Sequence, residues 1–310
     1  MAHTPTRERA RVDRSATVPA GRIRSAKRFP PAQVATDRGS LAVGLVTYNS
    51  ETDLKRTMVR TASVATSLRA ELCVFDNGST DSSVAVARSV PSAKVVANEA
   101  NRGFAYGVNQ LFAMTTASRL LLLNPDVDLV DGRTVSRLLR HFDDPRVGVV
   151  APRLLNPDGS VQESARRFPT ALGIARRLSP FHVALPGARP TVAADATSSD
   201  APAAVDWAIG AALLIHRAAF DATHGWDQGF FLYLEDVDFC LRASSAGWRT
   251  IYDPTVELVH THHRASHGTS LLGSKARRDH VRSMVRFFAK HRSLAPRPRA
   301  TALGRRSVDS

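Results

Sequence analysis

The stretch LAVGLVTYNS, residues 41–50, begins the part of the chain that decides the fold. Its first six residues are almost wholly apolar, which suits a strand buried on both faces of a sheet. A helical pattern follows at 51–68, and strand and helix then alternate up to residue 150. Further strands are expected at 72–75, 94–97, 120–123 and 147–150, with helices between them at 81–89, 105–115 and 131–142. This alternation predicts an α/β fold with a mostly parallel, doubly wound central sheet flanked by helices.

Polar residues gather just after the predicted strands, at 47–49, 76–77 and 124–128. Open sheets of this kind bind their ligands at the carboxyl ends of the strands. The sequence therefore predicts a ligand site formed by these polar turns.

The second half of the chain is less regular. Residues 152–204 are rich in Pro, Ala, Arg and Ser, and we expect a mobile loop at 185–204. Later elements are expected at 207–216 (strand or buried segment), 235–246 (helix), 250–252 and 256–260 (short strands), and 275–291 (basic helix). We predict three parts, namely a disordered basic segment 1–38, one catalytic domain 39–292 and a basic tail 293–310.

The net charge of +14 belongs to the two ends of the chain. Residues 1–40 contain nine Lys/Arg and three Asp/Glu, and residues 264–310 contain twelve and two. No aromatic residues interleave with the basic ones, so no nucleic-acid partner is expected. Attraction to an anionic membrane and a plain solubilising role both stay open. If the chain is attracted to a membrane, the basic residues expected to face it are Arg277, Arg278, Arg282 and Arg286.

Two further features bear on location. The longest apolar run, 208–215, is far shorter than the roughly 20 residues that cross a bilayer. We therefore expect a cytoplasmic protein, with peripheral contact on the inner face of the cell membrane as an open alternative. Cys73 and Cys240 fit neither a disulfide framework nor a zinc motif, and we interpret them as small buried hydrophobes.

Asp126 and Asp128 follow the strand predicted at 120–123. Two carboxylates at i and i+2 can converge on one cation, and hard oxygen ligands suit Mg²⁺ or Mn²⁺ that holds a diphosphate. The alternative is a solvated turn, because Asn, Pro and Asp all favour turns.

Two other loops in the first half have features of a nucleotide site. Asp76 and Asn77 end the second strand, where they can bind a base or ribose. The alternative is that Ser79 or Thr80 simply caps the next helix. Glycines at 103 and 107 allow a close approach of the backbone, and Arg102 can meet a phosphate.

Acidic and aromatic residues cluster at 226–238. Helical spacing places Glu235 and Asp238 on one face and Asp236 on another. A carboxylate directed into a cleft beside Trp226 can act as a general base. The helix dipole alone also explains acidic residues at this helix start. Histidines follow at 260, 262, 263 and 267, where one extra ligand to a carboxylate-held metal is favoured over a zinc site, and plain surface histidines are the remaining alternative.

Taken in order, these motifs resemble the family 2 inverting glycosyltransferases of the GT-A fold. The resemblance covers about residues 41–267 and rests on the segments 46–49, 76–81, 101–104, 123–128, 225–227 and 231–238. Within the family, the chain looks most like bacterial rhamnosyltransferases that use dTDP-L-rhamnose.

The resemblance implies a role for each matching residue. The substrate-binding set would be Thr47, Tyr48, Asn49, Asp76, Asn77, Arg102, Gly103, Phe104, Trp226, Asp227 and Glu235. Asp126, Asp128 and His260 would hold Mg²⁺ or Mn²⁺, and Asp236 would be the catalytic base. The run of histidines leaves the choice among His260, His262 and His263 open.

The resemblance also implies partners. The donor would be a nucleotide sugar, with dTDP-rhamnose favoured, and the acceptor a glycan or a sugar on a polyprenyl diphosphate, as in cell-envelope polysaccharide synthesis. A UDP- or GDP-sugar donor is the first alternative. A nucleotidyltransferase on a similar fold and a non-catalytic binding protein are the others. The loop at 185–204 matches the family poorly, so the acceptor side is the least defined.

Overall fold

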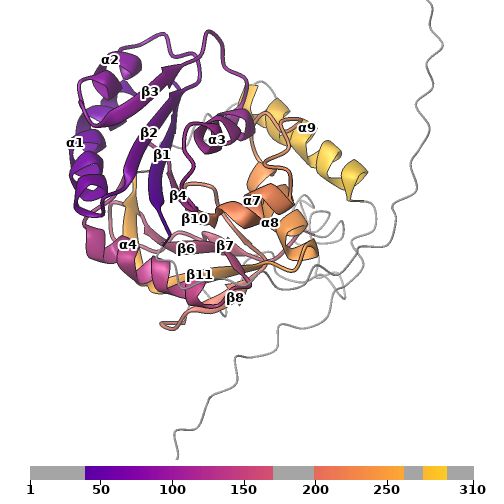
Figure 1. Ribbon diagram of the computed structural model, residues 1–310. Coiled ribbons are helices and arrows are strands. Elements are labelled where there is room, and N and C mark those ends of the chain that lie inside the picture. The colour runs from indigo at the N-terminus through magenta and orange to yellow at the C-terminus, as the bar shows by residue number, and fades with distance from the viewer. Residues whose placement is uncertain (1–38, 170–198, 262–274, 292–310) are drawn as a thin grey trace, which may run out of the picture. The chain divides into compact units, whose positions relative to one another are not determined.

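A nine-stranded sheet lies at the centre of the computed structural model, which describes residues 39–169, 199–261 and 275–291 (Figure 1). Along the chain its strands are β1 (Leu41–Thr47), β2 (Glu71–Asp76), β3 (Ala93–Ala97), β4 (Arg119–Leu123), β5 (Val127–Asp128), β6 (Val147–Leu155), β8 (Ala203–Val205), β10 (Ala212–His216) and β11 (Arg249–His260). Two short strands, β7 (Ala165–Arg166) and β9 (Trp207–Ala208), pair separately.

All the helices except α7, which the sequence does not predict, occupy segments where helices are expected. The helices are α1 (Glu51–Ser67), α2 (Ser83–Arg88), α3 (Phe104–Ala113), α4 (Gly132–Leu139) with a 3-10 turn η1 (Arg140–Asp143), α7 (Arg217–Ala222), α8 (Glu235–Ser245) and α9 (Lys275–Lys290). None of the helices in the described part of the chain is long and apolar enough to cross a membrane.

The strand order is β3-β2-β1-β4-β10-β6-β11-β5, with β8 also on β11. The first four strands run parallel, which confirms the predicted α/β sheet. β10 runs antiparallel between β4 and β6, whereas β6 and β11 are parallel to each other. The carboxyl ends of β1, β4 and β11 therefore lie at the same edge of the sheet, where β5 pairs with the end of β11.

Three segments differ from their predicted form. The segment predicted at 207–216 is divided between β9 and β10. The strands predicted at 250–252 and 256–260 are one strand, β11, whose register shifts around Pro254 because proline has no N–H to donate to the ladder. Ala203 and Ala204, placed in the loop 185–204, belong to β8, and the rest of that loop up to residue 198 lies outside the described residues.

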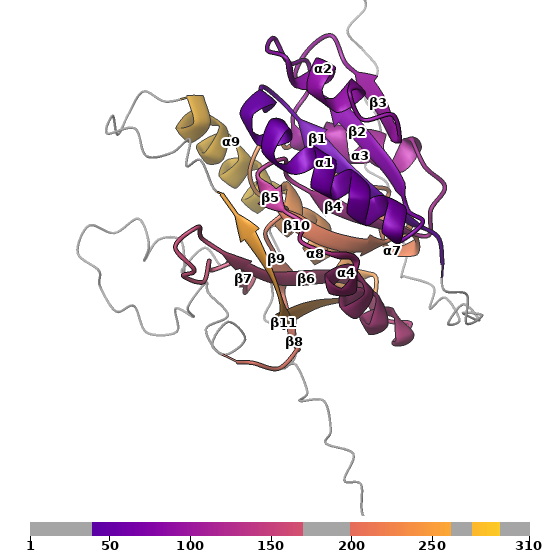
Figure 2. The same ribbon diagram turned by 90° about the vertical axis from the view of Figure 1, so that its left-hand side faces the viewer.

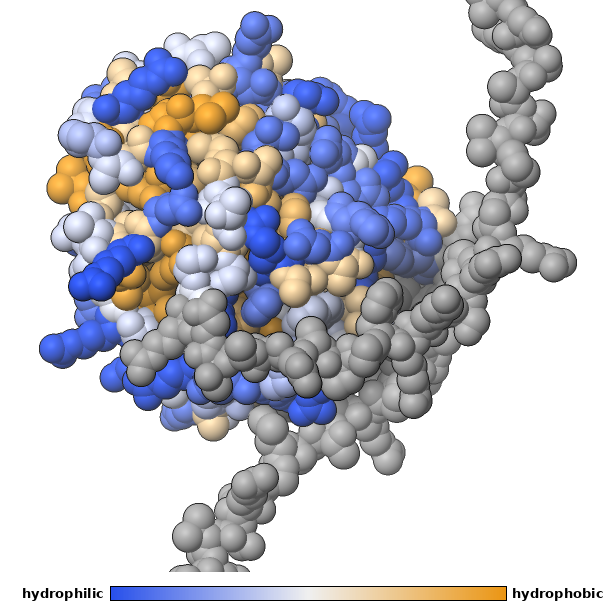
Figure 3. All heavy atoms as spheres, in the orientation of Figure 1, coloured by the Kyte–Doolittle hydropathy of each residue, from blue (hydrophilic) through white to orange (hydrophobic). Residues whose placement is uncertain are grey.

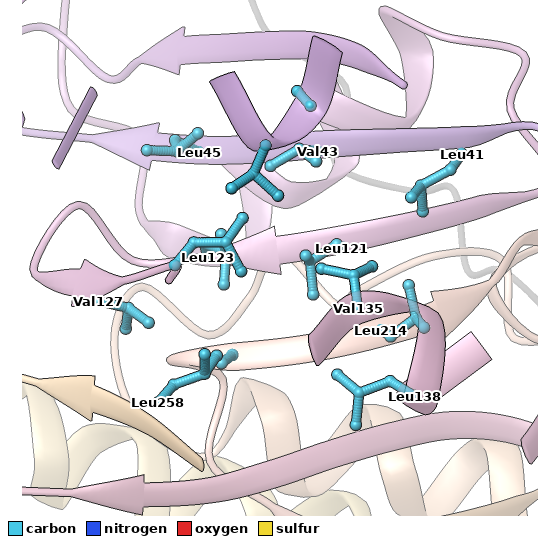
Figure 4. Close-up of a cluster of buried hydrophobic side chains, with 14 of the residues drawn as sticks. Leu41, Val43, Leu45, Leu121, Leu123, Val127, Val135, Leu138, Leu214 and Leu258 are labelled. Atoms are coloured by element: carbon cyan, nitrogen blue, oxygen red, sulfur yellow. The ribbon is translucent and has the colours of Figure 1, made fainter. Parts of the chain in front are cut away.

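Alternate residues of β1 face two separate cores. Leu41, Val43 and Leu45 pack with side chains of α1 and α4, and Figure 4 shows them beside Leu121 of β4. The opposite face packs on α3 and α8. Figure 1 accordingly places α1 and α4 on one side of the sheet and α3 and α8 on the other. This two-sided burial is what the apolar run at 41–47 predicts.

Both cysteines are fully buried within the second of these cores, as expected, and neither is in a disulfide. Burial raises the pKa of the Cys73 thiol to about 11 and that of Cys240 to about 12.

The last helix, α9, packs on the region around α8. Phe287 is fully buried against Phe230, Val237 and Leu241, and Figure 2 shows α9 from a second direction. The Ser283 hydroxyl donates to the carbonyl oxygen of Leu232 at 2.8 Å. The basic C-terminal helix is therefore an integral part of the fold.

Candidate active site

A cleft of about 470 Å³ opens at the carboxyl ends of β1 and β4. Six residues of the predicted site line it, namely Thr47, Tyr48, Asn77, Gly103, Phe104 and Asp126. Its wall is completed by residues from α1, from the loop before α8 and from α9, including Asp53, Phe231, Leu232 and Asp279. The structure thus brings together side chains that are up to 233 positions apart in the sequence, from Val46 to Asp279.

Asp76 is fully buried at the end of β2. Its carboxylate accepts hydrogen bonds from the Thr47 hydroxyl at 2.8 Å, from the Ser79 hydroxyl at 2.5 Å and from the Ser79 N–H at 2.9 Å. These contacts fix the turn that follows β2. Binding of a base by Asp76 itself stays a prediction.

Asn77 fastens the loop that precedes α3. Its side-chain N–H groups donate to Asn101 Oδ1 at 3.1 Å and to the Gly103 carbonyl at 2.9 Å. Gly103 has a φ of +91°, and a Cβ there would lie 2.6 Å from the carbonyl oxygen of Phe231. The Phe104 N–H donates to that same oxygen at 2.9 Å. Only glycine fits at 103, and the loop is held against the segment before α8.

Three other predicted residues are exposed around the cleft. Tyr48 has 47% of its surface exposed. Asn49 has a φ of +48°, and its side-chain oxygen accepts from the Thr80 N–H at 2.9 Å, so it links the turn after β1 to the turn after β2. The guanidinium of Arg102 lies 4.0 Å from the ring centre of Tyr106. Tyr48 and Arg102 thus present an aromatic ring and a positive charge to solvent.

The three predicted metal ligands have different surroundings. Asp126 lies next to His260, with Oδ1 3.3 Å from the imidazole Nε2. Asp128 lies on β5, where its Oδ2 is 2.5 Å from Arg56 of α1. The structure therefore joins Asp126 to His260 and gives Asp128 a cationic partner. His262 and His263 lie outside the described residues.

A divalent metal fits the Asp126–His260 pair. A carboxylate oxygen and an imidazole nitrogen facing each other are a donor set that Mn²⁺ accepts, and both Mn²⁺ and Mg²⁺ take remaining ligands from phosphates and water. Within the described ranges, no three His, Cys, Asp or Glu side chains form a ready cluster.

The start of α8 carries two unusual carboxyl groups. Burial raises the pKa of Glu235 well above its ordinary value, and it raises the pKa of Asp236 to about 6. Asp236 is only partly buried, and its Oδ2 accepts from the Gly210 N–H at 3.0 Å. A Cβ on Gly210 would lie within 3.3 to 3.7 Å of Phe104, Trp226 and Asp236. Asp236 is thus a neighbour of Phe104, a wall residue of the cleft.

The two residues before α8 have a strained backbone. Tyr233 and Leu234 have φ values of +71° and +66°, in the left-handed region. Each such residue costs about 1–3 kcal/mol, so the surrounding contacts must hold it there. The strain lets the chain pass from the cleft wall at 231–232 directly into α8, with Asp236 in its first turn.

Trp226 and Asp227 have roles that differ from each other. Trp226 is buried, stacked on Phe239 at 5.3 Å and edge-on to Phe104 at 5.9 Å. Asp227 lies 2.9 Å from Arg286 and 2.6 Å from Lys290 of α9. Burial raises the pKa of Asp227, but hydrogen bonds from Lys290, Gly229 and Arg286 outweigh it and lower the pKa to about 2. The Asp227 carboxylate therefore anchors α9, and a role on the acceptor side stays a prediction.

Residues 42–199 match the family Glycosyl transferase family 2. The chain belongs to this family.

Curated relatives of this family 2 member include rhamnosyltransferases. The N-acetylglucosaminyl-diphospho-decaprenol L-rhamnosyltransferase of Mycobacterium tuberculosis is 31% identical over 267 residues, which cover 82% of this chain and 85% of the relative. Rhamnosyltransferase WbbL of Escherichia coli K12 is 41% identical over 93 residues, covering 30% of this chain and 34% of that protein. The expected family is thereby confirmed.

Solved structures of glycosyltransferases share the fold. A mannosyltransferase from Pyrobaculum calidifontis, in complex with GDP-Man and Mn²⁺, superimposes with a TM-score of 0.56 at 18% identity, covering 87% of this chain and 70% of the other. GalNAc-T7 with UDP, GalNAc and Mn²⁺ gives 0.60 at 14% identity, covering 82% and 48%. This family 2 enzyme thus has the GT-A fold that the sequence predicts.

Several residues of the family 2 site were not singled out from the sequence. Asn101, Asp53 and Asp279 line the cleft, Arg56 meets Asp128, and Gln162 contacts His260. Asn101 belongs to the segment 101–104 that carries the family resemblance, so the sequence holds a signal for it. The others belong to helices or a hairpin with no local signal, and only the folded chain brings them to the cleft.

Proposed function

We propose that this family 2 glycosyltransferase transfers L-rhamnose from dTDP-L-rhamnose to a sugar carried on a polyprenyl diphosphate, with Mg²⁺ or Mn²⁺ bound and with inversion at the anomeric carbon. The support for this donor and acceptor is the M. tuberculosis relative, whose name gives both rhamnosyl transfer and a diphospho-decaprenol acceptor and which aligns over 82% of this chain.

One observation carries the chemical part of the proposal. Asp126 and Phe104 both line the cleft; the Asp126 carboxylate faces His260 behind the wall, and Asp236 lies near Phe104. A carboxylate and an imidazole that could hold a metal, and a carboxyl group with a raised pKa near the same cleft, suit an inverting transfer to a hydroxyl.

In the proposed reaction, the Asp236 carboxylate accepts the proton of the acceptor hydroxyl. That oxygen forms the new bond to the anomeric carbon, while the bond from this carbon to the diphosphate oxygen breaks. Attack on the face opposite the leaving group inverts the carbon. Asp126 and His260 would hold the divalent cation, which supplies neutralisation of the departing diphosphate when bound. With a pKa of about 6, Asp236 is ionised at neutral pH and still basic enough to take part in proton transfer.

The nucleotide part of the donor is assigned to the turns after β1 and β2. We assign stacking on the base to Tyr48, which lines the cleft and is 47% exposed, and phosphate contact to Arg102, which is exposed beside Tyr106. Asn77 and Gly103 shape the intervening backbone, so their contribution is to position the loop that the nucleotide contacts.

We further propose that α9 meets an anionic membrane that holds the acceptor lipid. Its outward face carries Arg278 and Arg282 together with Val281 and Val285, which are 53% and 66% exposed. Hydrophilic residues predominate over α9 in the space-filling view (Figure 3). Arg286, assigned to the same face from sequence, contacts Asp227 instead, and the Arg277 side chain lies outside the described residues. Asp279 of the same helix lines the cleft, so membrane contact through α9 would bring the cleft close to the lipid surface.

The test of the donor is a panel of dTDP-, UDP- and GDP-sugars, assayed for binding and for turnover with and without Mn²⁺ or Mg²⁺. Metal-dependent binding and use of dTDP-L-rhamnose alone is the expected result. Preference for a UDP- or GDP-sugar would reject the rhamnosyl donor but keep the glycosyltransferase. Release of pyrophosphate with transfer of a nucleoside monophosphate would instead identify a nucleotidyltransferase.

A further inference from the structure

Gln162 lies in the hairpin that follows β6 and reaches the end of β11. Its backbone N–H donates to the Leu154 carbonyl at 2.8 Å, and its side chain is partly buried. Both ends of the Gln162 amide contact His260, although the two residues are 98 positions apart. Neither the sequence nor the proposed reaction assigns any task to this residue.

The contacts of the amide nitrogen decide which way the Gln162 amide points. Its Nε2 is 2.9 Å from the His260 carbonyl oxygen and 3.4 Å from that of Leu155. Backbone carbonyls only accept hydrogen bonds, so the NH₂ group must face them. The third neighbour of Nε2 is Asn156 Oδ1 at 2.9 Å, and Asn156 in turn donates to the Ser160 hydroxyl. The orientation is therefore set by the network of contacts.

The opposite end of the amide then fixes the imidazole. Gln162 Oε1 is 2.9 Å from His260 Nδ1, and since Oε1 can only accept, Nδ1 must carry the proton. In the neutral ring, Nε2 is then the atom with the lone pair. That atom faces Asp126 Oδ1 at 3.3 Å.

We propose that Gln162 is a positioning residue that holds His260 in the tautomer needed to bind a divalent cation together with Asp126. The inference rests on the proposed metal site and deepens it. A histidine that binds a metal usually donates its other N–H to an acceptor, which fixes the tautomer and the orientation of the ring. Gln162 supplies that acceptor here, and its hold on the His260 carbonyl fixes the backbone at the same place.

The first test uses the folded, metal-free, wild-type chain. Nitrogen-15 spectra of histidine-labelled protein, with His260 assigned by comparison with His260→Gln, report which ring nitrogen carries the proton in the neutral ring. The proton is expected on Nδ1. A neutral His260 with its proton on Nε2 would overturn the proposal, and this result needs neither a bound metal nor a Gln162 variant.

The second test measures binding of Mn²⁺ to the full chain saturated with dTDP, by titration calorimetry or by the electron paramagnetic resonance of free Mn²⁺. Gln162→Met keeps the length of the side chain and removes both its donor and its acceptor. Loss of an outer-shell partner typically weakens metal binding about 10- to 100-fold, and a weakening of this size is expected. Gln110→Met, the same change on α3, is the matched control and should bind Mn²⁺ like the wild type.

The outcomes separate the two levels of the proposal. Wild-type protein that fails to bind Mn²⁺ in the presence of dTDP would reject the proposed metal site, while the tautomer measurement would still decide the position of the proton. A folded Gln162→Met protein with unchanged Mn²⁺ affinity would reject the role of Gln162 and leave the metal site in place.

Discussion

Asp236 is the residue on which the proposed reaction depends most. Replacing it by Asn leaves one oxygen to accept from Gly210 or from Val237 and removes the base, so turnover is expected to fall by about 10²–10⁴-fold. The affinity for dTDP should change little.

In the wild type, kcat/KM should fall as the pH drops below about 6, because protonated Asp236 cannot accept a proton. Steady-state kinetics between pH 5 and 8 measure both effects, and Asp221→Asn on the exposed side of α7 is the control. Near-normal turnover of the Asp236→Asn enzyme would reject the assignment of Asp236 as the catalytic base.

The same raised pKa predicts an effect on stability. Burial makes the ionised form of Asp236 costly, so the folded state holds its proton up to about pH 6, whereas an unfolded Asp loses it near pH 4. Between these values the folded state binds more protons, and the stability of the wild type falls as the pH rises. Asp236→Asn should therefore have the higher melting temperature at pH 7.5, by roughly a few degrees, and lose most of this advantage at pH 4. A variant less stable than the wild type at pH 7.5 would contradict this account.

Asp126 and Asp128 should not be equivalent. Asp126 lines the cleft and faces His260, whereas the carboxylate of Asp128 contacts Arg56. Asp126→Asn is expected to weaken Mn²⁺ binding in the presence of dTDP by at least about tenfold, as the loss of a carboxylate ligand should. Asp128→Asn should have a clearly smaller effect on the same titration. An equal loss of Mn²⁺ affinity in the two variants would indicate that both carboxylates bind the metal.

At the level of elements, α9 links the fold to the cleft. Phe287 is its buried contact with α8. Two residues of the cleft wall belong to the same two segments: Leu232 precedes α8, and Asp279 is on α9. Phe287→Ala should lower the free energy of unfolding by about 3–5 kcal/mol, the usual effect of truncating a buried Phe. It should also reduce turnover at saturating donor. Urea unfolding gives the first quantity, and Val285→Ala on the outward face should leave both near the wild-type values.

The sequence predicts the elements up to β6, apart from the two-residue strand β5, because their signals are local. Each predicted strand of this part is a short apolar run, and each helix has its own apolar spacing. The antiparallel position of β10 has no local signal, since a buried strand reads the same in either direction. Likewise, Pro254 suggests a break in β11, but the strand continues past it because the shift in register absorbs the missing N–H.

The site was predictable where a motif sits at the end of its strand, as for Thr47, Asn77 and Asp126. It was not predictable where a contact joins distant segments, as for Gln162 and His260. The pairing of Asp128 with Arg56 belongs to the same class, because the two residues are 72 positions apart and neither shows a partner in the sequence.

At the scale of the whole molecule, the charge distribution predicts salt-sensitive binding to membranes. Arg278 and Arg282 stand on the outward face of α9, and basic residues near an anionic surface contribute about 1 kcal/mol each. Replacing both by Ser should weaken binding to vesicles that contain anionic lipid by about tenfold or more. Co-sedimentation at low and high salt measures this, with Arg60→Ser combined with Arg133→Ser as a control of equal charge. Unchanged binding of the α9 variant would remove this helix from the membrane contact.

The two buried cysteines have a practical consequence for following this enzyme at work. Thiol reagents attack the thiolate, and Cys73 and Cys240 are both shielded by the core and ionise only at strongly alkaline pH. A cysteine introduced at Val285, on the outward side of α9, would therefore be the site that takes a fluorescent or spin label in the native protein. The approach of this helix to a lipid surface could then be watched directly, without first building a cysteine-free background.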